Sequence, residues 1–246
     1  LTAVAPLKLF DLAEKLRGEW LKVLGKRREW DAFDTEYPPL VQADQEITCY
    51  ALQNRLRLAD LGALDQARPL WFMPADLPES CMPLMEQLLA DKRLGTDDIW
   101  ERLRRLLEAK KLGAAKATAA YLPVGQAPSA KTLDAIADKP LRHLALLPPN
   151  FAASRQGREV ALFAVQRLAR TDPAQAAQQW EGIRDKFSAA DGAYIYAQLG
   201  WQAALRHLPE ALAWYAKAGS APLSDEQVAW KVRAALRAQN WAVVGE

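Results

Sequence analysis

Apolar and polar residues follow one another along this chain with the period of an α-helix. Leucine, alanine, valine and tryptophan recur three and four positions apart in almost every stretch, which places them on one face of a helix. Runs of alternating β-branched residues bounded by hairpin turns, the pattern of β-strands, do not occur. The pattern predicts an all-α protein.

A unit of two helices recurs along the sequence. In each copy an amphipathic helix ends near a leucine, a short turn of polar, basic or glycine residues follows, and a second helix opens with alanine or tryptophan. The expected turns follow Leu24, Leu58, Leu107, Leu168, Leu205 and Leu236. These leucines are 34, 49, 61, 37 and 31 residues apart. Several intervals lie near the period of about 34 residues of tetratricopeptide repeats, and the longer ones hold additional helices.

Two segments show how the unit varies. Residues 132–151, inside the longest interval, predict two short helices broken at Pro140 and at Pro148 and Pro149, because proline cannot continue a helix. Residues 196–218 come closest to the tetratricopeptide pattern. The matching positions are Tyr196, Leu199, Gly200, Ala211, Tyr215 and Ala218.

A single helix pair cannot bury its own apolar face, so consecutive pairs have to stack and share a continuous core. We therefore expect residues 1–246 to form one superhelical domain, a tetratricopeptide-like α-solenoid that is curved or ring-forming. Its expected sub-blocks are about residues 1–125 and 126–246. The chain starts without methionine and stops within what reads as the opening of a helix, so we expect a fragment of a longer protein.

Composition and charge narrow the range of functions. Hydrophobic residues make up 50% and charged residues 25% of the chain, as in ordinary globular proteins. The 32 basic and 30 acidic residues leave a formal net charge of +2, too weak a field to indicate nucleic-acid binding. No apolar run approaches the roughly 18 to 20 residues of a membrane-spanning helix. Neither nucleic acid nor a membrane span is predicted.

Residues typical of catalysis or metal binding are sparse. The two histidines, His143 and His207, have no further histidine, cysteine or paired carboxylate at a ligand spacing, so each is interpreted as a turn or helix-end residue. The glycines are scattered singly, and no phosphate loop or G-x-S-x-G motif occurs. We predict no metal, no cofactor and no catalytic residue in this segment.

Tryptophan is enriched, with nine residues. Aromatic rings at this density are typical of platforms that stack on sugars or peptides, and equally of side chains wedged between stacked helices. Because most occupy equivalent places in the repeat, we interpret them as packing residues, chiefly Trp20, Trp30, Trp201, Trp214, Trp230 and Trp241. The basic residues 26–28 and 110–111 are interpreted as helix ends, where cations complement the helix dipole.

The two cysteines are Cys49 and Cys81. Composition alone leaves two states open, one disulfide or two buried free thiols. The dipeptide Glu79-Ser80 precedes Cys81 and is the one place where neighbouring residues suggest a catalytic motif.

The helix units, the placement of the cysteines and the turn sequences together resemble a known family. They are similar to the soluble lytic transglycosylases of Gram-negative bacteria, in the long N-terminal superhelical U domain of that family. The similarity runs over nearly the whole chain, and its most specific stretches are residues 16–33, 47–123 and 158–180.

The resemblance implies a Cys49–Cys81 disulfide and hence an oxidising compartment, which for this family is the periplasm. The family cleaves the glycan strands of peptidoglycan to 1,6-anhydromuramyl ends through one glutamate of a C-terminal lysozyme-like domain. That glutamate stands in an E-S motif followed by G-L-M-Q. Because Glu79-Ser80 lacks the second part, no catalytic residue is carried over to this chain.

The resemblance implies a non-catalytic scaffold over which the protein's own C-terminal catalytic domain docks. Glycan strands of peptidoglycan or cell-wall proteins are its further implied partners. One alternative is a tetratricopeptide-like scaffold that binds a partner peptide and has no attached enzyme. Another is an all-α glycosidase that acts through carboxylates inside this chain.

Overall fold

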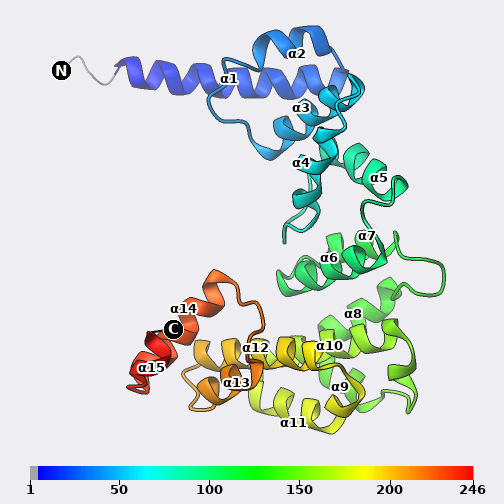
Figure 1. Ribbon diagram of the computed structural model, residues 1–246, viewed down its shortest axis with the longest axis vertical. Coiled ribbons are helices and arrows are strands. Elements are labelled where there is room, and N and C mark those ends of the chain that lie inside the picture. The colour runs from blue at the N-terminus through cyan, green and yellow to red at the C-terminus, as the bar shows by residue number, and fades with distance from the viewer. Residues whose placement is uncertain (1–4, 246) are drawn as a thin grey trace. The chain divides into compact units, whose positions relative to one another are not determined.

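The computed structural model describes residues 5–245, with side chains from Phe10 onward. This part of the chain forms fifteen α-helices and three short 3₁₀-helices and contains no β-strand (Figure 1). Successive helices pair through short turns, as in an α-superhelical fold. The predicted all-α class and the stacking of helix pairs are confirmed.

The chain divides into two compact units, Leu1–Thr118 and Ala119–Glu246. The first contains α1 (Ala5–Arg27), α2 (Trp30–Glu36), α3 (Gln45–Arg57), α4 (Gly62–Trp71), η1 (Glu79–Cys81), α5 (Met82–Ala90), α6 (Thr96–Glu108) and α7 (Leu112–Ala119). The second contains α8 (Ala130–Asp138), α9 (Pro140–Ala145), η2 (Phe151–Ala153), α10 (Arg155–Ala169), α11 (Pro173–Ile183), η3 (Arg184–Lys186), α12 (Ala189–Leu205), α13 (Ala211–Ala218), α14 (Asp225–Arg237) and α15 (Trp241–Val244). That residues 1–246 form one superhelical domain stays a prediction.

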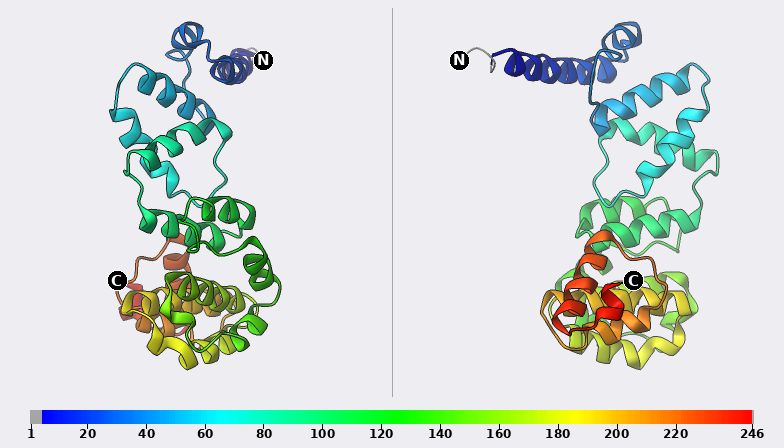
Figure 2. Two further views of the ribbon diagram at one scale, coloured as in Figure 1. Left: turned by 90° about the vertical axis from the view of Figure 1, so that its right-hand side faces the viewer. Right: turned by 60° about the vertical axis from the view of Figure 1, so that its left-hand side comes forward.

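The core of the first unit begins where the 23-residue helix α1 meets α2 and α3 (Figure 2). Gly25 allows this approach, because a Cβ atom at its position would lie 2.3 Å from Cγ of Tyr50 on α3. The aromatic rings of Phe33 and Tyr37 stack beside this contact, with centroids 5.4 Å apart. The buried cluster consists of Leu21, Leu24, Phe33, Ile47 and Tyr50.

A disulfide joins α3 to the start of α5. Cys49 and Cys81 are bonded, their Cα atoms are 5.0 Å apart, and both side chains are fully buried. Two hydrogen bonds support the same junction: the amide of Gln53 donates to the carbonyl of Ser80 at 2.6 Å, and the Ser80 hydroxyl donates to the carbonyl of Glu46 at 3.0 Å. The pairing that the resemblance implied is thus present in the structure.

The second unit is built around α12 and α13, which lie side by side along most of α13. Gly200 of α12 faces the ring of Tyr215 of α13, whose atoms would lie 2.9 to 3.1 Å from an added Cβ. The Tyr215 hydroxyl donates to the carbonyl of Gln227 at 2.9 Å, which connects α13 to α14. All six residues that matched the tetratricopeptide spacing are buried in this pair.

Most of the predicted turns share one geometry. A residue just beyond the helix adopts the left-handed conformation, with φ between 55° and 64°, and the next N–H donates to the carbonyl five residues earlier. This is the Schellman motif, which satisfies carbonyls at a helix end. Within the described residues, the left-handed positions outside glycine are Arg28, Ala59, Lys92, Lys110, His207 and Gln239.

All six expected turns are present. Five of them contain the left-handed residue, whereas the turn after Leu168 is made by Asp172, whose side chain accepts from the N–H of Gln175, and by Pro173 at the start of α11. The turn at Lys92 was not predicted. The two short helices expected within residues 132–151 are also confirmed, as α8 and α9.

The tryptophans divide into three groups by exposure. Trp20 and Trp241 are 47% and 67% exposed, and the packing role expected of them stays a prediction. The most deeply buried rings are those of Trp71, Trp100 and Trp180. The remaining predicted packing residues lie half-buried against the core clusters of the two units: Trp30, Trp201, Trp214 and Trp230.

Candidate functional site

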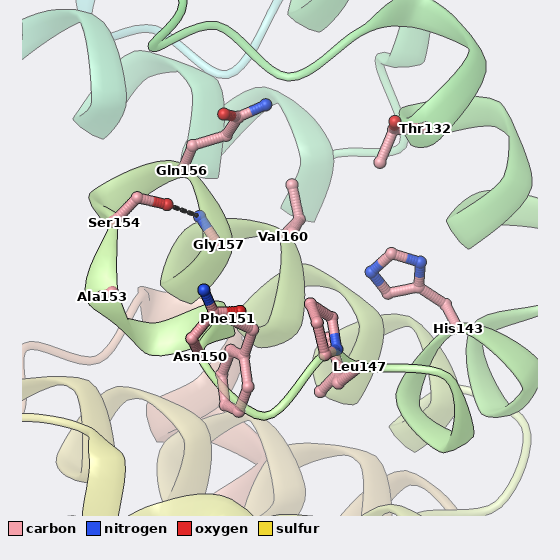
Figure 3. A pocket seen from close by; sticks show the side chains of 11 residues that line it. Thr132, His143, Leu147, Asn150, Phe151, Ala153, Ser154, Gln156, Gly157 and Val160 are labelled. Carbon is pink, nitrogen blue, oxygen red and sulfur yellow. Dashed lines mark hydrogen bonds between the residues drawn. The ribbon is translucent and has the colours of Figure 1, made fainter.

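The second unit contains a cavity of about 430 Å³ whose walls come from α8, α9, η2 and the start of α10 (Figure 3). Its volume falls within the range of about 300 to 1,000 Å³ that is typical of small-molecule sites. We call it the His143 cavity, after the imidazole in its wall.

Local sequence explains how the wall forms. Ser154 caps α10, since its hydroxyl accepts from the N–H of Gly157 at 3.0 Å. Gly157 lets η2 lie directly on this first turn, because a Cβ atom there would lie 1.8 Å from the carbonyl oxygen of Phe151. Pro140 begins α9, and Pro148 lies in the loop between α9 and η2. The Ser154 cap and the prolines at the start of α9 and in the loop after it therefore bring His143 and the first turn of α10 to the same cavity.

The polar groups of the cavity are uncharged, and most have partners. The amide of Gln156 donates to the carbonyl of Ala127 at 3.0 Å, and the hydroxyl of Thr132 lies 2.8 Å from that of Ser129. The Nε2 atom of His143 is buried and has no hydrogen-bond partner among the residues that the structure describes. Burial lowers the pKa of His143 from its ordinary value near 6.5, because desolvation disfavours the imidazolium. The imidazole is therefore neutral at physiological pH.

The rest of the wall is apolar. Leu147, Pro148, Phe151 and Val160 face the space, and the ring of Phe151 packs against Phe187 with centroids 6.0 Å apart. Figure 3 shows the imidazole of His143 on one side and the Ser154–Gly157 capping bond on the other, with Val160 and Leu147 between them. The cavity thus combines an apolar floor with hydrogen-bonding groups at its edges.

A second cavity, of about 400 Å³, also involves α9 but has the opposite character. Its wall carries the cationic side chains of Lys139, Arg142 and Arg167. Arg167 donates from Nε to the carbonyl of Ala137 at 2.9 Å, and Lys139 pairs with Asp138 at 3.7 Å. The Arg167 contact fastens α8 to α10, so part of the positive charge serves the fold.

The residues singled out from the sequence, His143, His207, Glu79 and Ser80, each have their own local surroundings. His207 is the left-handed residue of its turn, and its ring lies 6.2 Å from that of Trp230. Ser80 is buried and its hydroxyl is bonded to the backbone of α3, whereas Glu79 is exposed. His143 is at a helix end, as expected, but its place in a cavity was missed. The wall comes from four consecutive elements whose packing on one another the spacing does not specify, and the S-x-x-G cap at residues 154–157 was the one local signal.

Two further observations concern the described residues as a whole. Within residues 5–245, no three histidine, cysteine, aspartate or glutamate side chains gather as ligands of a metal ion would. In the same part of the chain, no helix combines the length and the apolar composition needed to cross a membrane.

Comparison with known proteins identifies a fold. No protein-family model matches the chain, and no curated protein matches its sequence. Among solved structures, an inactive mutant of the lytic transglycosylase Slt from Pseudomonas aeruginosa aligns with 94% of this chain, at a TM-score of 0.69 and 24% identity. The 70-kDa soluble lytic transglycosylase from Escherichia coli aligns with 95%, at 0.59 and 18%. A 70-kDa soluble lytic transglycosylase in complex with bulgecin A aligns with 95% of this chain, at a TM-score of 0.58 and 19% identity.

The chain spans 38% of the length of each of these transglycosylases. It therefore has the α-superhelical fold of one part of such enzymes, and the resemblance drawn from the sequence is confirmed at the level of the fold.

Proposed function

We propose that this chain is the non-catalytic α-superhelical scaffold of a periplasmic lytic transglycosylase, which cleaves peptidoglycan glycan strands to 1,6-anhydromuramyl ends during peptidoglycan turnover. The observation that carries the proposal is the fold match over 94% of this chain and 38% of the transglycosylase Slt. Because nearly all of this chain aligns with little more than a third of the enzyme, the chain corresponds in fold to one part of it.

The disulfide supports the compartment. A bond between Cys49 and Cys81 persists in oxidising surroundings and is rare in the reducing cytosol. Because both side chains are fully buried, thiol titration is carried out on the unreduced protein after unfolding in denaturant, and it is expected to detect no free thiol. Two reactive thiols under those conditions would favour the alternative, a tetratricopeptide-like scaffold without an attached enzyme.

The environment of Glu79 and Ser80 supports a structural role for the dipeptide. Ser80 is 4% exposed and its hydroxyl donates to the carbonyl of Glu46, so it holds η1 against α3. The glutamate beside it is exposed and opens the short helix η1. General acid catalysis on a glycosidic bond needs a carboxyl group in a substrate cleft with a raised pKa. The proposal therefore assigns catalysis to a domain outside these 246 residues.

The proposal is tested on purified peptidoglycan sacculi. We expect the longer parent chain to release 1,6-anhydromuropeptides, detected by mass spectrometry, and the 246-residue chain alone to release none. Product from the 246-residue chain would place an active site within it. A parent chain that neither cleaves sacculi nor contains an E-S motif followed by G-L-M-Q would overturn the proposal in favour of the interaction scaffold.

A further inference from the structure

The cationic cavity of about 400 Å³ in the second unit, which we call the Arg142 cavity, combines positive charge with apolar surface. Its wall comes from residues 137–142, where α8 meets α9, and from the end of α10 with Thr171 after it. We propose that this cavity binds the C-terminal carboxylate of a polypeptide that ends in a large apolar residue. Such a site is independent of the activity assigned to the parent chain.

The charge in the cavity is not balanced by its own wall. Lys139, Arg142 and Arg167 face one carboxylate among the described lining residues, that of Asp138. Asp138 pairs with Lys139 at 3.7 Å, and both side chains are largely exposed, so solvent and salt screen this pair. Arg142 is exposed and forms no ion pair or hydrogen bond within the described part of the chain. An incoming anion therefore displaces no acid from this guanidinium.

Arg167 adds a second guanidinium, which is held in place by the backbone. Its Nε donates to the carbonyl of Ala137 at 2.9 Å, whereas its two Nη groups have no partner among residues 5–245. A guanidinium presents parallel N–H groups that match the two oxygens of a carboxylate. Because the bond to Ala137 already orders the side chain, little conformational entropy is lost when an anion binds it.

The apolar part of the wall favours an organic anion over an inorganic one. Pro140, Leu141 and Leu168 line the same space as the cations. An inorganic anion would leave these surfaces in contact with water. A ligand that carries an apolar group close to its charge covers them, and removal of apolar surface from water is favourable. The ligand therefore joins an oxyanion to a compact apolar group.

The last residue of a polypeptide has this arrangement, because its carboxylate and its side chain are attached to the same Cα atom. Aspartate and glutamate differ, since their carboxylate ends the side chain and no apolar group lies beside it. The volume of the cavity is in the range of small-ligand sites, so only the end of a chain enters and the preceding residues stay in solvent. Capture of a C-terminal carboxylate is an established mode of peptide recognition.

The test measures peptide binding to the 246-residue chain by isothermal titration calorimetry at low salt. The probe is N-acetyl-Ala-Ala-Leu with a free carboxylate, and the comparison peptides are its C-terminal amide and N-acetyl-Ala-Ala-Ala. We expect saturable binding at millimolar concentration, weaker by at least about tenfold for the amide and about fivefold for the alanine peptide. No binding of the leucine peptide, or equal binding of the amide, would overturn the proposal. Equal binding of the alanine peptide would overturn the need for a large apolar residue.

A further probe separates a polypeptide from a small metabolite. The anion 4-methylpentanoate has the carboxylate and the isobutyl group of leucine but no peptide bond. We expect it to bind more weakly than the peptide, and equal binding would overturn the assignment to a polypeptide. Inorganic phosphate is expected to compete only weakly, because it covers none of the apolar wall.

A charge-matched pair of variants places the binding in the cavity. Arg142→Gln removes a cation from the wall, whereas Arg237→Gln removes one from the exposed end of α14, outside the lining. Arg142→Gln is expected to weaken the leucine peptide about tenfold and to abolish its advantage over the amide, and Arg237→Gln to leave both unchanged. Thermal unfolding of both variants checks that the fold is retained. Equal weakening by the two variants would show a response to net charge alone and overturn the site.

Failure of this site is distinguishable from failure of the proposed function. A parent chain that cleaves sacculi while the leucine peptide stays unbound overturns the Arg142 cavity alone. Peptide binding in a protein whose parent cleaves nothing overturns the transglycosylase assignment alone.

Discussion

The two units place a glycine against a tyrosine ring at the centre of their packing, but they secure that contact by different means. In the first unit Gly25 faces Tyr50, and α3, which carries the tyrosine, is bonded covalently to the start of α5. In the second unit Gly200 faces Tyr215, and the pair is secured by α12, a 17-residue helix, and by a hydrogen bond to α14. A covalent bond thus anchors the tyrosine-bearing helix of the first unit, and a hydrogen bond to a third helix anchors that of the second.

The largest expected effect is a loss of stability that removal of the disulfide causes in the first unit alone. The double variant Cys49→Ala/Cys81→Ala is expected to lower the unfolding free energy of the first unit by about 3 to 4 kcal/mol, since the disulfide closes a loop across a sequence separation of 32 residues. Hydrogen exchange measured on peptides of each unit checks this. Reductant should have the same effect on the wild type and none on the variant. Equal loss of protection in the second unit would contradict the comparison.

The next effect compares the two glycines. Gly25→Ala is expected to destabilise by about 1 to 3 kcal/mol, and more than Gly200→Ala, because the added Cβ would meet its tyrosine at 2.3 Å rather than 2.9 Å. Urea unfolding of each variant provides the measurement.

The controls for the glycine pair come from open positions. Gly113 and Gly182 lie in helices with no atom within 4 Å of an added Cβ, so alanine there should stabilise by up to about 1 kcal/mol through helix propensity. If Gly25→Ala behaved like Gly113→Ala, the close contact with Tyr50 would not be a constraint on the first unit.

Replacing a buried amide in the second unit is expected to raise the unfolding free energy. Gln166 on α10 is 2% exposed, and neither atom of its amide has a hydrogen-bond partner among the described residues. Gln166→Met keeps the length of the side chain and removes both polar atoms, so the variant should gain at least about 1 kcal/mol in unfolding free energy. Gln202→Met is the control and should lose stability, because Oε1 of Gln202 accepts from Arg206 at 3.2 Å. Stabilisation by both substitutions would show that the amide of Gln166 is not the cause.

A smaller gain is expected in a turn of the first unit. Ala59 has a φ of 64°, a left-handed conformation that costs an L-residue about 1 to 2 kcal/mol. Glycine avoids this cost, but it loses more conformational entropy on folding, which offsets part of the gain. Ala59→Gly should therefore stabilise by about 0.5 kcal/mol in thermal or urea unfolding. Ala109→Gly, at a helix end with φ of −78°, should destabilise instead. A loss in both variants would contradict the Schellman geometry at Ala59.

The smallest effect is a pH dependence confined to the second unit. Because burial lowers the pKa of His143 in the folded protein, the unfolded chain binds a proton more readily below about pH 6.5. Stability should be full above that pH and fall as the pH drops toward the folded pKa. His143→Gln removes this component, so wild type and variant should diverge in unfolding free energy between neutral and acidic pH. Parallel curves would show that His143 is not buried as a neutral group.

Much of the fold follows from local sequence patterns. The helical period of the apolar residues predicted the all-α class, and the turns after Leu24 and Leu107 follow from leucine and the basic residues after it. The turn at Lys92 escaped notice because a left-handed lysine leaves no mark in the sequence comparable to that of glycine. The pairing of Cys49 with Cys81 came from family resemblance, since two cysteines alone leave the redox state open.

The tryptophans show where local reasoning fails. Trp20 and Trp71 both lie in helical stretches with similar apolar neighbours, yet one ring is 47% exposed and the other 1%. Spacing identifies the apolar face of a helix but not which part of that face another helix covers. Spacing therefore gave the same expectation for Trp30, which packs against the core of the first unit, and for Trp20, which is exposed.

By itself, the sequence determined which segments are helical, where most of them end, and that no familiar catalytic motif is present in the chain. Those properties depend on residues within a few positions of one another, through side-chain periodicity, capping and the conformational limits of proline. Only the tertiary structure decided which rings are buried and that His143 and the Ser154–Gly157 turn face one space. Burial and cavities arise from close packing between separate elements, which the spacing within a single helix cannot specify.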